Sequence, residues 1–159
     1  MLITKEPLII DAFDERNSNY WIDSSIRKFL NVNLYNSFSA EEKGKIIKTK
    51  STILLAQDHT HVKQQGVLPY YWNSFTNLQD KDITRYYQTY SYDYIFLLNS
   101  FEYYTYITKN NIVEKENMAF ITPYVNNTNM IRYIGEYGYI YINDAKLDYS
   151  IYPCMWIKK

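Results

Sequence analysis

The apolar residues of this chain come in short runs separated by polar turns, and no run approaches the roughly 18 residues of a membrane-spanning helix. No internal repeat, heptad register or Pro/Gly/Ser-rich linker divides the sequence. A chain of 159 residues can bury roughly two thirds of its unfolded surface in one core. We therefore expect a single domain over residues 1–159, of the α+β class. Short helices should pack on a small, mostly antiparallel sheet, with long irregular loops and a C-terminal hairpin.

The charges are balanced, with 17 Lys and Arg against 17 Asp and Glu. Because no net charge would draw a phosphate backbone or an anionic membrane to the chain, we expect neither nucleic-acid binding nor membrane insertion.

Residues 1–7 lack the basic and apolar regions of a signal peptide, which predicts a cytoplasmic protein unless the chain is a module from a longer exported one. The single Cys154 lies in an apolar run and is interpreted as a buried thiol.

Tyrosine is the unusual component of the composition, with 19 residues in the chain. Two explanations stay open: an AT-rich genome that enriches Tyr, Asn, Ile and Lys together, or a binding face on which Tyr supplies rigid amphipathic contacts. Residues 57–92 are polar and aromatic with weak periodicity, which predicts a long irregular loop. Such loops often carry function.

A first helix is predicted after Trp21, which we expect to anchor the core. Asp23 or Ser24 can accept a backbone N–H as the N-cap, and Asn31 suits the left-handed position that ends a helix. The apolar residues between them share one helical face: Ile22, Ile26, Phe29 and Leu30.

Two further helix starts carry the spacing of a capping box, Ser39 with Glu42 and Asn99 with Glu102. The earlier of these helices should end near Ile47. Strands are predicted at residues 2–3 or 8–10, 52–56, 93–98 and 151–157. Residues 130–134 and 139–143 flank two glycines and predict the C-terminal hairpin.

Three patterns follow one another along the chain, each with a specific internal spacing: W-x-x-S-x-x-R-x-x-L-N, then F-x-x-x-E, then D-x-[VI]-F-L-L-S-x-x-E. The matching residues are Trp21, Ser24, Arg27, Leu30, Asn31, Phe38, Glu42, Asp93, Ile95, Phe96, Leu97, Leu98, Asn99 and Glu102, with Asn99 at the serine position. In these patterns the chain resembles a family of uncharacterised, Firmicutes-type bacterial domains of unknown function. Residues 151–157 resemble the terminal V-R-P-A-L-W-I of that family, with Tyr152 in place of the arginine.

The resemblance implies an architecture similar to C-type-lectin-like and formylglycine-generating-enzyme-like folds, and it implies no reaction. The family's W-W-L-R-S segment has its nearest counterpart in Ile131-Arg132. We interpret the signature residues as structural: Trp21, Ser24, Arg27, Leu30, Asn31, Phe96, Asn99 and Glu102. Arg27 is expected to form an ion pair with Glu102 or Glu42.

Patterns that would indicate catalysis are weak. His59 and His61 place two imidazoles on one side of an extended segment, but a catalytic zinc needs a third protein ligand. The chain has no Gly-rich phosphate loop and no nucleophile turn, and Cys154 has no neighbouring base. We therefore expect no cofactor and no bound metal, and we favour a role other than that of an enzyme.

The sequence predicts a non-catalytic recognition module that binds a protein or glycan surface through its aromatic-rich loop region. The candidate ligand-binding residues are Tyr70, Tyr71, Trp72, Tyr86, Tyr87 and Tyr90. Two alternatives stay open: a small metal-dependent hydrolase that uses His59 and His61, and an intracellular inhibitor or immunity-type protein. Neither the ligand nor the oligomeric state can be read from the sequence.

Overall fold

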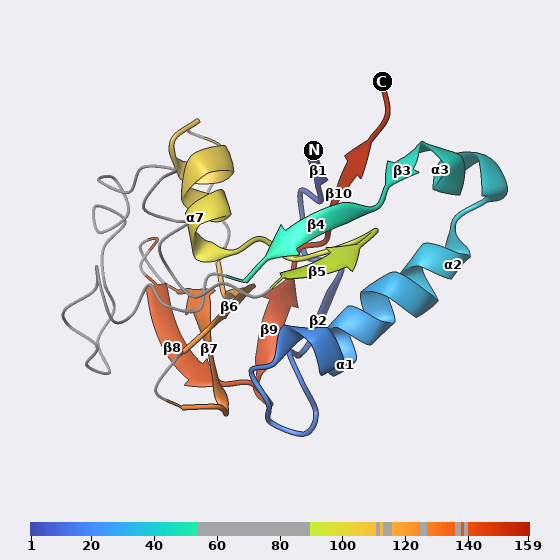
Figure 1. Ribbon diagram of the computed structural model, residues 1–159. Helices are drawn as coiled ribbons and strands as arrows, with labels where there is room; N and C mark the ends of the chain where they lie inside the picture. Colours follow the sequence, from blue (N-terminus) through green and yellow to red (C-terminus); the bar gives the residue numbers. More distant parts are fainter. Residues whose placement is uncertain (54–89, 111, 113–115, 125–126, 136–137, 139) are drawn as a thin grey trace.

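The computed structural model describes residues 1–53, 90–110, 112, 116–124, 127–135, 138 and 140–159. In this part of the chain three sheets combine with two groups of short helices, which is the expected α+β class (Figure 1). In Figure 1, α1 (Ser25–Lys28) and α2 (Tyr35–Ser37) lie on one side of the sheets and α7 (Ser100–Tyr103) on the other. The two chain ends lie close together because the first and last strands pair with each other.

The largest sheet has five strands in the order β2-β9-β6-β7-β8. They are β2 (Ile9–Ala12), β9 (Asp148–Ile151), β6 (Met118–Pro123), β7 (Met130–Ile134) and β8 (Ile140–Asp144). Neighbouring strands are antiparallel except for β6 and β9, which are parallel. The predicted hairpin is β7–β8, in which Met130 pairs with Asp144 and Ile134 with Ile140.

Two smaller antiparallel sheets complete the strands of the described residues. β1 (Leu2–Ile3), β10 (Cys154–Ile157) and β3 (Ile46–Ile47) form one, and β4 (Thr49–Thr52) and β5 (Tyr90–Asp93) form a two-stranded ribbon. Both N-terminal candidates are therefore strands. The single strand predicted over 151–157 is two strands in different sheets, because Tyr152 and Pro153 leave the ladder between β9 and β10.

β4 and β5 lie earlier in the chain than the strands predicted near them. β4 ends at Thr52, where the predicted strand 52–56 begins, and residues 54–56 lie outside the described residues. β5 ends at Asp93, the predicted start of the strand 93–98. Residues 95–98 are buried but form only an isolated bridge, between Phe96 and Cys154. An apolar run reports burial, and burial alone does not require a ladder partner on either side.

The first helical region is continuous beyond the predicted end. It consists of a 3₁₀ turn η1 (Trp21–Asp23), α1 (Ser25–Lys28), a π-helix η2 (Phe29–Leu34) and α2 (Tyr35–Ser37). Ser24 is the N-cap, and its Oγ accepts the N–H of Arg27 at 3.2 Å. The prediction that Asn31 ends the helix is wrong, because Asn31 lies inside η2 and its amide bonds to the backbone of Ile95.

The two predicted capping boxes both form. α3 (Ala40–Lys45) begins after Ser39, whose Oγ accepts the N–H of Glu42 at 3.3 Å, while Glu42 Oε2 accepts the N–H of Ser39 at 2.8 Å. α7 (Ser100–Tyr103) continues into a π-helix, η3 (Tyr104–Thr108). Asn99 and Glu102 cap it reciprocally, at 3.0 and 2.8 Å. α3 ends at Lys45, before the predicted Ile47, because Ile46 begins β3.

One cluster of buried apolar side chains joins the sheets to both helix groups. Trp21 is fully buried in it, and its ring lies 5.9 Å from that of Phe13, measured between centroids. All six residues of β6 are buried. Cys154 is a buried free thiol that donates to the carbonyl of Tyr152 at 3.6 Å, so its interpretation is confirmed.

Glu102 should give the chain a measurable pH dependence. Burial of its carboxyl group raises the pKa from 4.5 to about 7, against the opposing effect of the N–H of Asn99. Between these two pH values the native chain holds a proton that the unfolded chain has released, so stability falls as the pH rises. This contribution is complete below about pH 4.5 and lost once the pH has risen through about 7, at a cost of up to about 3 kcal/mol.

Denaturant unfolding at about pH 5 and about pH 8 tests this effect. Glu102→Gln keeps an acceptor oxygen for the N–H of Asn99 but cannot ionise. We expect the variant to lose less stability than the parent between the two pH values. Equal losses in the two proteins would show that the Glu102 carboxyl does not titrate in this range.

Candidate functional site

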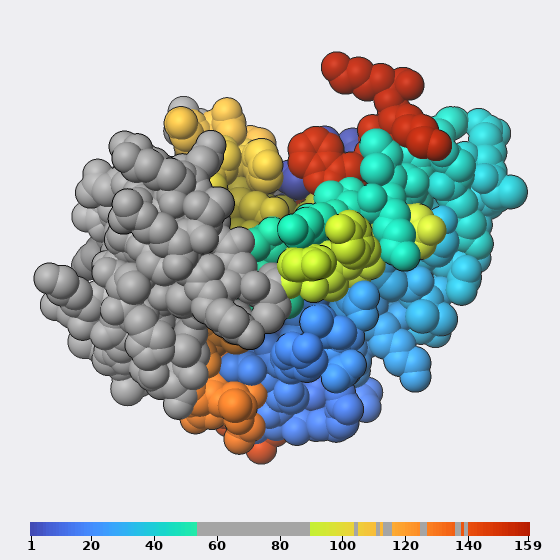
Figure 2. All heavy atoms as spheres, in the orientation of Figure 1, coloured from blue at the N-terminus to red at the C-terminus, as the bar shows by residue number. Residues whose placement is uncertain are grey.

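The β4–β5 ribbon has two different faces, because side chains alternate in direction along a strand. On the inner face, Ser91 and Asp93 are buried. On the outer face Lys50, Tyr90 and Tyr92 are exposed, and Lys50 lies directly opposite Tyr92 in the register. We call Lys50, Tyr90 and Tyr92 the tyrosine–lysine face. Figure 2 shows β4 and β5 at the molecular surface, next to α1.

Asp93 is the centre of a buried polar network beneath this face. Its Oδ1 accepts from Arg27 Nε at 2.7 Å, and its Oδ2 accepts from Trp21 Nε1 at 3.0 Å and from the hydroxyl of Ser91. A fully buried carboxylate would cost several kcal/mol if it were left unpaired, so each of these donors stabilises the fold. The network fixes the inner face of β5 against the first helical region.

The ion pair predicted for Arg27 is present, but both predicted partners are wrong. Glu42 and Glu102 accept backbone N–H groups in the caps of α3 and α7 instead. Arg27 pairs with Asp93, which lies 66 positions away in the sequence. Alternation along β5 turns Asp93 inward, and the pairing of β5 with β4 places it beside α1.

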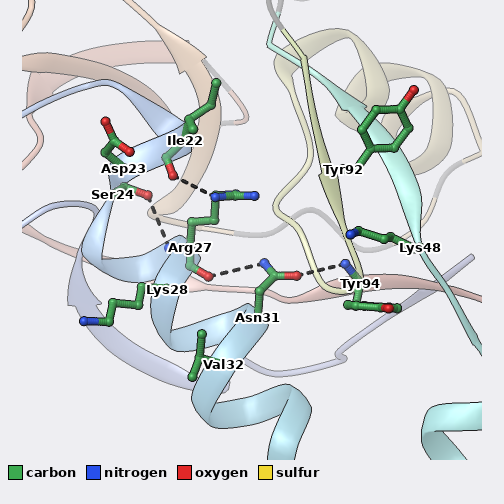
Figure 3. Close-up of a pocket in the computed structure, with 10 residues that line it drawn as sticks. All are labelled: Ile22, Asp23, Ser24, Arg27, Lys28, Asn31, Val32, Lys48, Tyr92 and Tyr94. Atoms are coloured by element: carbon green, nitrogen blue, oxygen red, sulfur yellow. Dashed lines mark hydrogen bonds between the residues drawn. The ribbon is translucent and has the colours of Figure 1, made fainter.

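Asn31 holds the helical region at a set separation from β5. Its Nδ2 donates to the carbonyl oxygen of Arg27 at 3.2 Å, and its Oδ1 accepts the N–H of Tyr94 at 2.8 Å (Figure 3). The same amide also bonds to the backbone of Ile95, with Nδ2 donating to the carbonyl at 2.7 Å and Oδ1 accepting the N–H at 3.2 Å. These contacts satisfy backbone groups where the chain leaves β5 and has no ladder partner. Asn31 is therefore a bridge between two elements rather than a helix stop.

A cleft of about 480 Å³ lies between this helical region and β5. Arg27 and Asn31 line it from the helical side, and Lys48, Tyr92 and Tyr94 line it from the side of the ribbon. Figure 3 shows the guanidinium of Arg27 and the amino group of Lys48 pointing into the gap from opposite sides. The volume is in the range of small-molecule sites.

The aromatic rings at the cleft differ in how firmly they are held. Tyr94 stacks on Tyr35 with centroids 4.1 Å apart, and Lys48 Nζ lies 5.5 Å from the Tyr94 centroid. Tyr92 meets Tyr90 edge to face at 5.8 Å, and these side chains remain 55% and 51% exposed. Tyr94 is therefore part of the wall, whereas Tyr92 offers ring surface to a ligand.

Among the predicted ligand-binding residues, the structure describes Tyr90. The others, Tyr70, Tyr71, Trp72, Tyr86 and Tyr87, lie outside the described residues, as do His59 and His61. Tyr90 is exposed, but it lies in a strand, so the prediction of an irregular loop up to Tyr92 is wrong for its last three residues. Pairing with β4 imposes an order there that weak periodicity did not indicate.

Sequence analysis missed Lys48 and Tyr94 as residues of the cleft. The sequence signal that could have found Tyr94 is the alternation Tyr90, Tyr92, Tyr94, which has the period of a strand. Lys48 has no comparable local signal, because its place at the cleft depends on the pairing of β4 with β5.

Neither a metal cluster nor a membrane helix occurs in the described part of the chain. Within these ranges no three His, Cys, Asp or Glu side chains are grouped closely enough to hold a metal ion. None of the helices there combines the length and the apolar character needed to cross a bilayer. The alternative of a metal-dependent hydrolase at His59 and His61 is not tested, because both residues lie outside the described ranges.

A second cavity, of about 400 Å³, lies at the β7–β8 hairpin, where Tyr133, Gly135 and Tyr141 line it. A Cβ on Gly135 would come within 2.5 Å of the Tyr141 ring, so glycine permits this close approach.

Arg132 is buried on β7. It belongs to Ile131-Arg132, the nearest counterpart in this chain of the W-W-L-R-S segment of the family that the sequence patterns resemble. Its guanidinium lies 5.5 Å from the ring of Tyr124, and burial lowers its pKa to about 9.

A family model described as "Domain of unknown function (DUF6273)" matches residues 1–159. The chain belongs to the DUF6273 family. The expected membership in an uncharacterised domain family is thereby confirmed. Neither a curated protein nor a solved structure matches this DUF6273 chain.

Proposed function

We propose that this DUF6273 chain is a non-catalytic recognition module that binds a protein or glycan surface through tyrosines on and near β5. The observation that carries the proposal is the pair Tyr90 and Tyr92, about half exposed on the outer face of a strand. The inner face of the same strand is fixed through Asp93. Exposed tyrosines on a rigid scaffold provide large contact areas at a low cost in conformational entropy.

The proposal also includes the bacterial source and the C-type-lectin-like architecture of the family that the sequence patterns resemble. The small antiparallel sheets and the late β7–β8 hairpin support that architecture. The predicted residues Tyr86 and Tyr87 belong to the proposed surface because they precede Tyr90 closely in the sequence. Tyr70, Tyr71 and Trp72 extend the same aromatic-rich segment.

Alanine at Tyr90 or Tyr92 is expected to leave the melting temperature near that of the parent, because an exposed side chain contributes about 0.5 kcal/mol or less. Binding should be lost on an array of neutral and acidic glycans or on a peptide array. Phenylalanine at either position is the matched control, since it keeps the ring. The same alanine test applies to Tyr71, Trp72 and Tyr87, where the proposal expects near-native melting with binding lost.

Two results would count against this proposal. Alanine variants that bind and melt like the parent would remove these tyrosines from the interface. Alanine variants that all unfold would show that the tyrosines pack as a lid over the sheet.

A further inference from the structure

We infer that the cleft between α1 and β5 binds a carboxylate between the guanidinium of Arg27 and the amino group of Lys48, and that its ligand is a glycan containing uronic acid. This inference rests on the proposed recognition function and names the ligand chemistry at one site. It goes beyond the exposed tyrosines, because it assigns a charged group and the two side chains that hold it.

Arg27 has donors available for such a ligand. A guanidinium carries five N–H groups. Nε donates to Asp93 Oδ1 and Nη1 donates to the carbonyl of Ile22, each at 2.7 Å. Three N–H groups on Nη1 and Nη2 remain, with no acceptor among the described residues. They form the end of the guanidinium fork, which can contact both oxygens of a carboxylate.

The cleft concentrates positive charge on a chain whose net charge is zero. Arg27 and Lys48 supply this charge, and the opposite charges of Lys28 and Asp23, which also line the cleft, offset each other. In Figure 3 the side chains of Asp23 and Lys28 point away from the gap, whereas Arg27 and Lys48 point into it. Asp93 offsets the charge of Arg27 from the buried side. An anion between the two facing cations would relieve their repulsion.

The two cations are positioned before a ligand arrives. Asp93 and the carbonyl of Ile22 fix the guanidinium, and the side chain of Arg27 is only 25% exposed. The amino group of Lys48 lies over the ring of Tyr94, which is itself held by stacking. A preorganised, partly buried guanidinium binds an anion more strongly than a mobile side chain does, and the exposed Lys48 adds a second positive charge.

Tyr92 favours a sugar over an acidic peptide as the bearer of the carboxylate. Its side chain is 55% exposed and lines the cleft from the same side as Lys48. The apolar C–H face of a pyranose can pack on an aromatic face, while a carboxylate on the same sugar reaches the cations. A cleft of about 480 Å³ suits a compact sugar residue better than an extended peptide backbone.

Titration calorimetry with uronate trisaccharides, compared with neutral hexose trisaccharides of the same configuration and linkage, tests the inference. We expect the uronates to bind at least about tenfold more tightly, with an affinity that falls as salt is added. Lys48→Met should lower uronate affinity about tenfold and leave neutral-sugar affinity unchanged. Lys28→Met is the matched control, because Lys28 lines the same cleft but points away, and it should change affinity less than about twofold.

Uronate binding that survives Lys48→Met would overturn the carboxylate site, as would equal effects of the two lysine variants. Arg27→Lys, checked first for native melting, should also weaken uronate binding, because lysine keeps the charge but lacks the fork. Binding of oligoglutamate in preference to uronates would overturn the glycan assignment. Binding of neutral sugars that depends on Tyr92 alone would overturn this inference and leave the proposed recognition function standing.

Discussion

Replacing Trp21 with alanine is expected to lower the free energy of unfolding by about 3–5 kcal/mol, a large part of the total stability of a domain. Trp21 is fully buried against Phe13, so the change removes a large apolar side chain from the core. It also removes the indole N–H that donates to Ser91 and Asp93. Urea unfolding followed by circular dichroism measures the loss.

Trp21→Phe separates the two contributions, because phenylalanine keeps an aromatic ring and lacks the N–H. We expect a smaller loss, about 1–3 kcal/mol, from the buried carboxylate of Asp93 that would then lack one donor. A Trp21→Ala variant that is soluble and melts like the parent would contradict the assignment of Trp21 as the core anchor.

Asp93→Ala is expected to cost a similar amount, about 3–5 kcal/mol, for an electrostatic reason. The variant leaves Arg27 part-buried without its carboxylate, and it removes one of the two acceptors of the Trp21 N–H and the acceptor of the Ser91 hydroxyl. The loss should appear in urea unfolding at neutral pH. Breaking one side of a buried pair is costly because the remaining charge is not compensated.

A double-mutant cycle with Arg27→Met shows how much of this cost comes from the ion pair. If the remaining charge of Arg27 causes the loss, the double variant should be more stable than the sum of the single losses predicts. Additive losses would mean that Asp93 acts through Trp21 and Ser91 rather than through Arg27.

Local sequence patterns were sufficient to place the helix starts. Ser24, Ser39 and Asn99 each cap a helix through contacts with a residue three positions later. Such contacts depend only on neighbouring side chains and backbone, so their spacing can be read directly from the sequence. The β7–β8 hairpin was predictable for the same reason, because its two strands are joined by a short glycine-containing turn.

β6 shows where periodicity is ambiguous. Its residues 118–123 were not assigned to a strand, although 118–121 are continuously apolar. All six residues are buried, so the strand lacks the alternation that marks a half-exposed strand. A fully buried strand and a buried helical turn cannot be distinguished by pattern alone.

The candidate site was predictable only in part. An aromatic-rich binding region was expected, and Tyr90 is exposed at its end. The cleft itself was not expected, because Arg27 and Lys48 approach it from segments whose relative position depends on Asn31 and Asp93.

By itself, the sequence determined the α+β class, the helix caps, the hairpin and the burial of Trp21 and Cys154, since these follow from composition and from contacts between near neighbours. Only the tertiary structure decided that Arg27 pairs with Asp93 and that Asn31 bridges two elements instead of ending a helix. The partners in these pairs lie more than 60 positions apart. The local sequence around Arg27 and Asn31 does not favour one distant partner over another. Their partners are set when strand pairing brings one buried carboxylate and one set of backbone groups within reach.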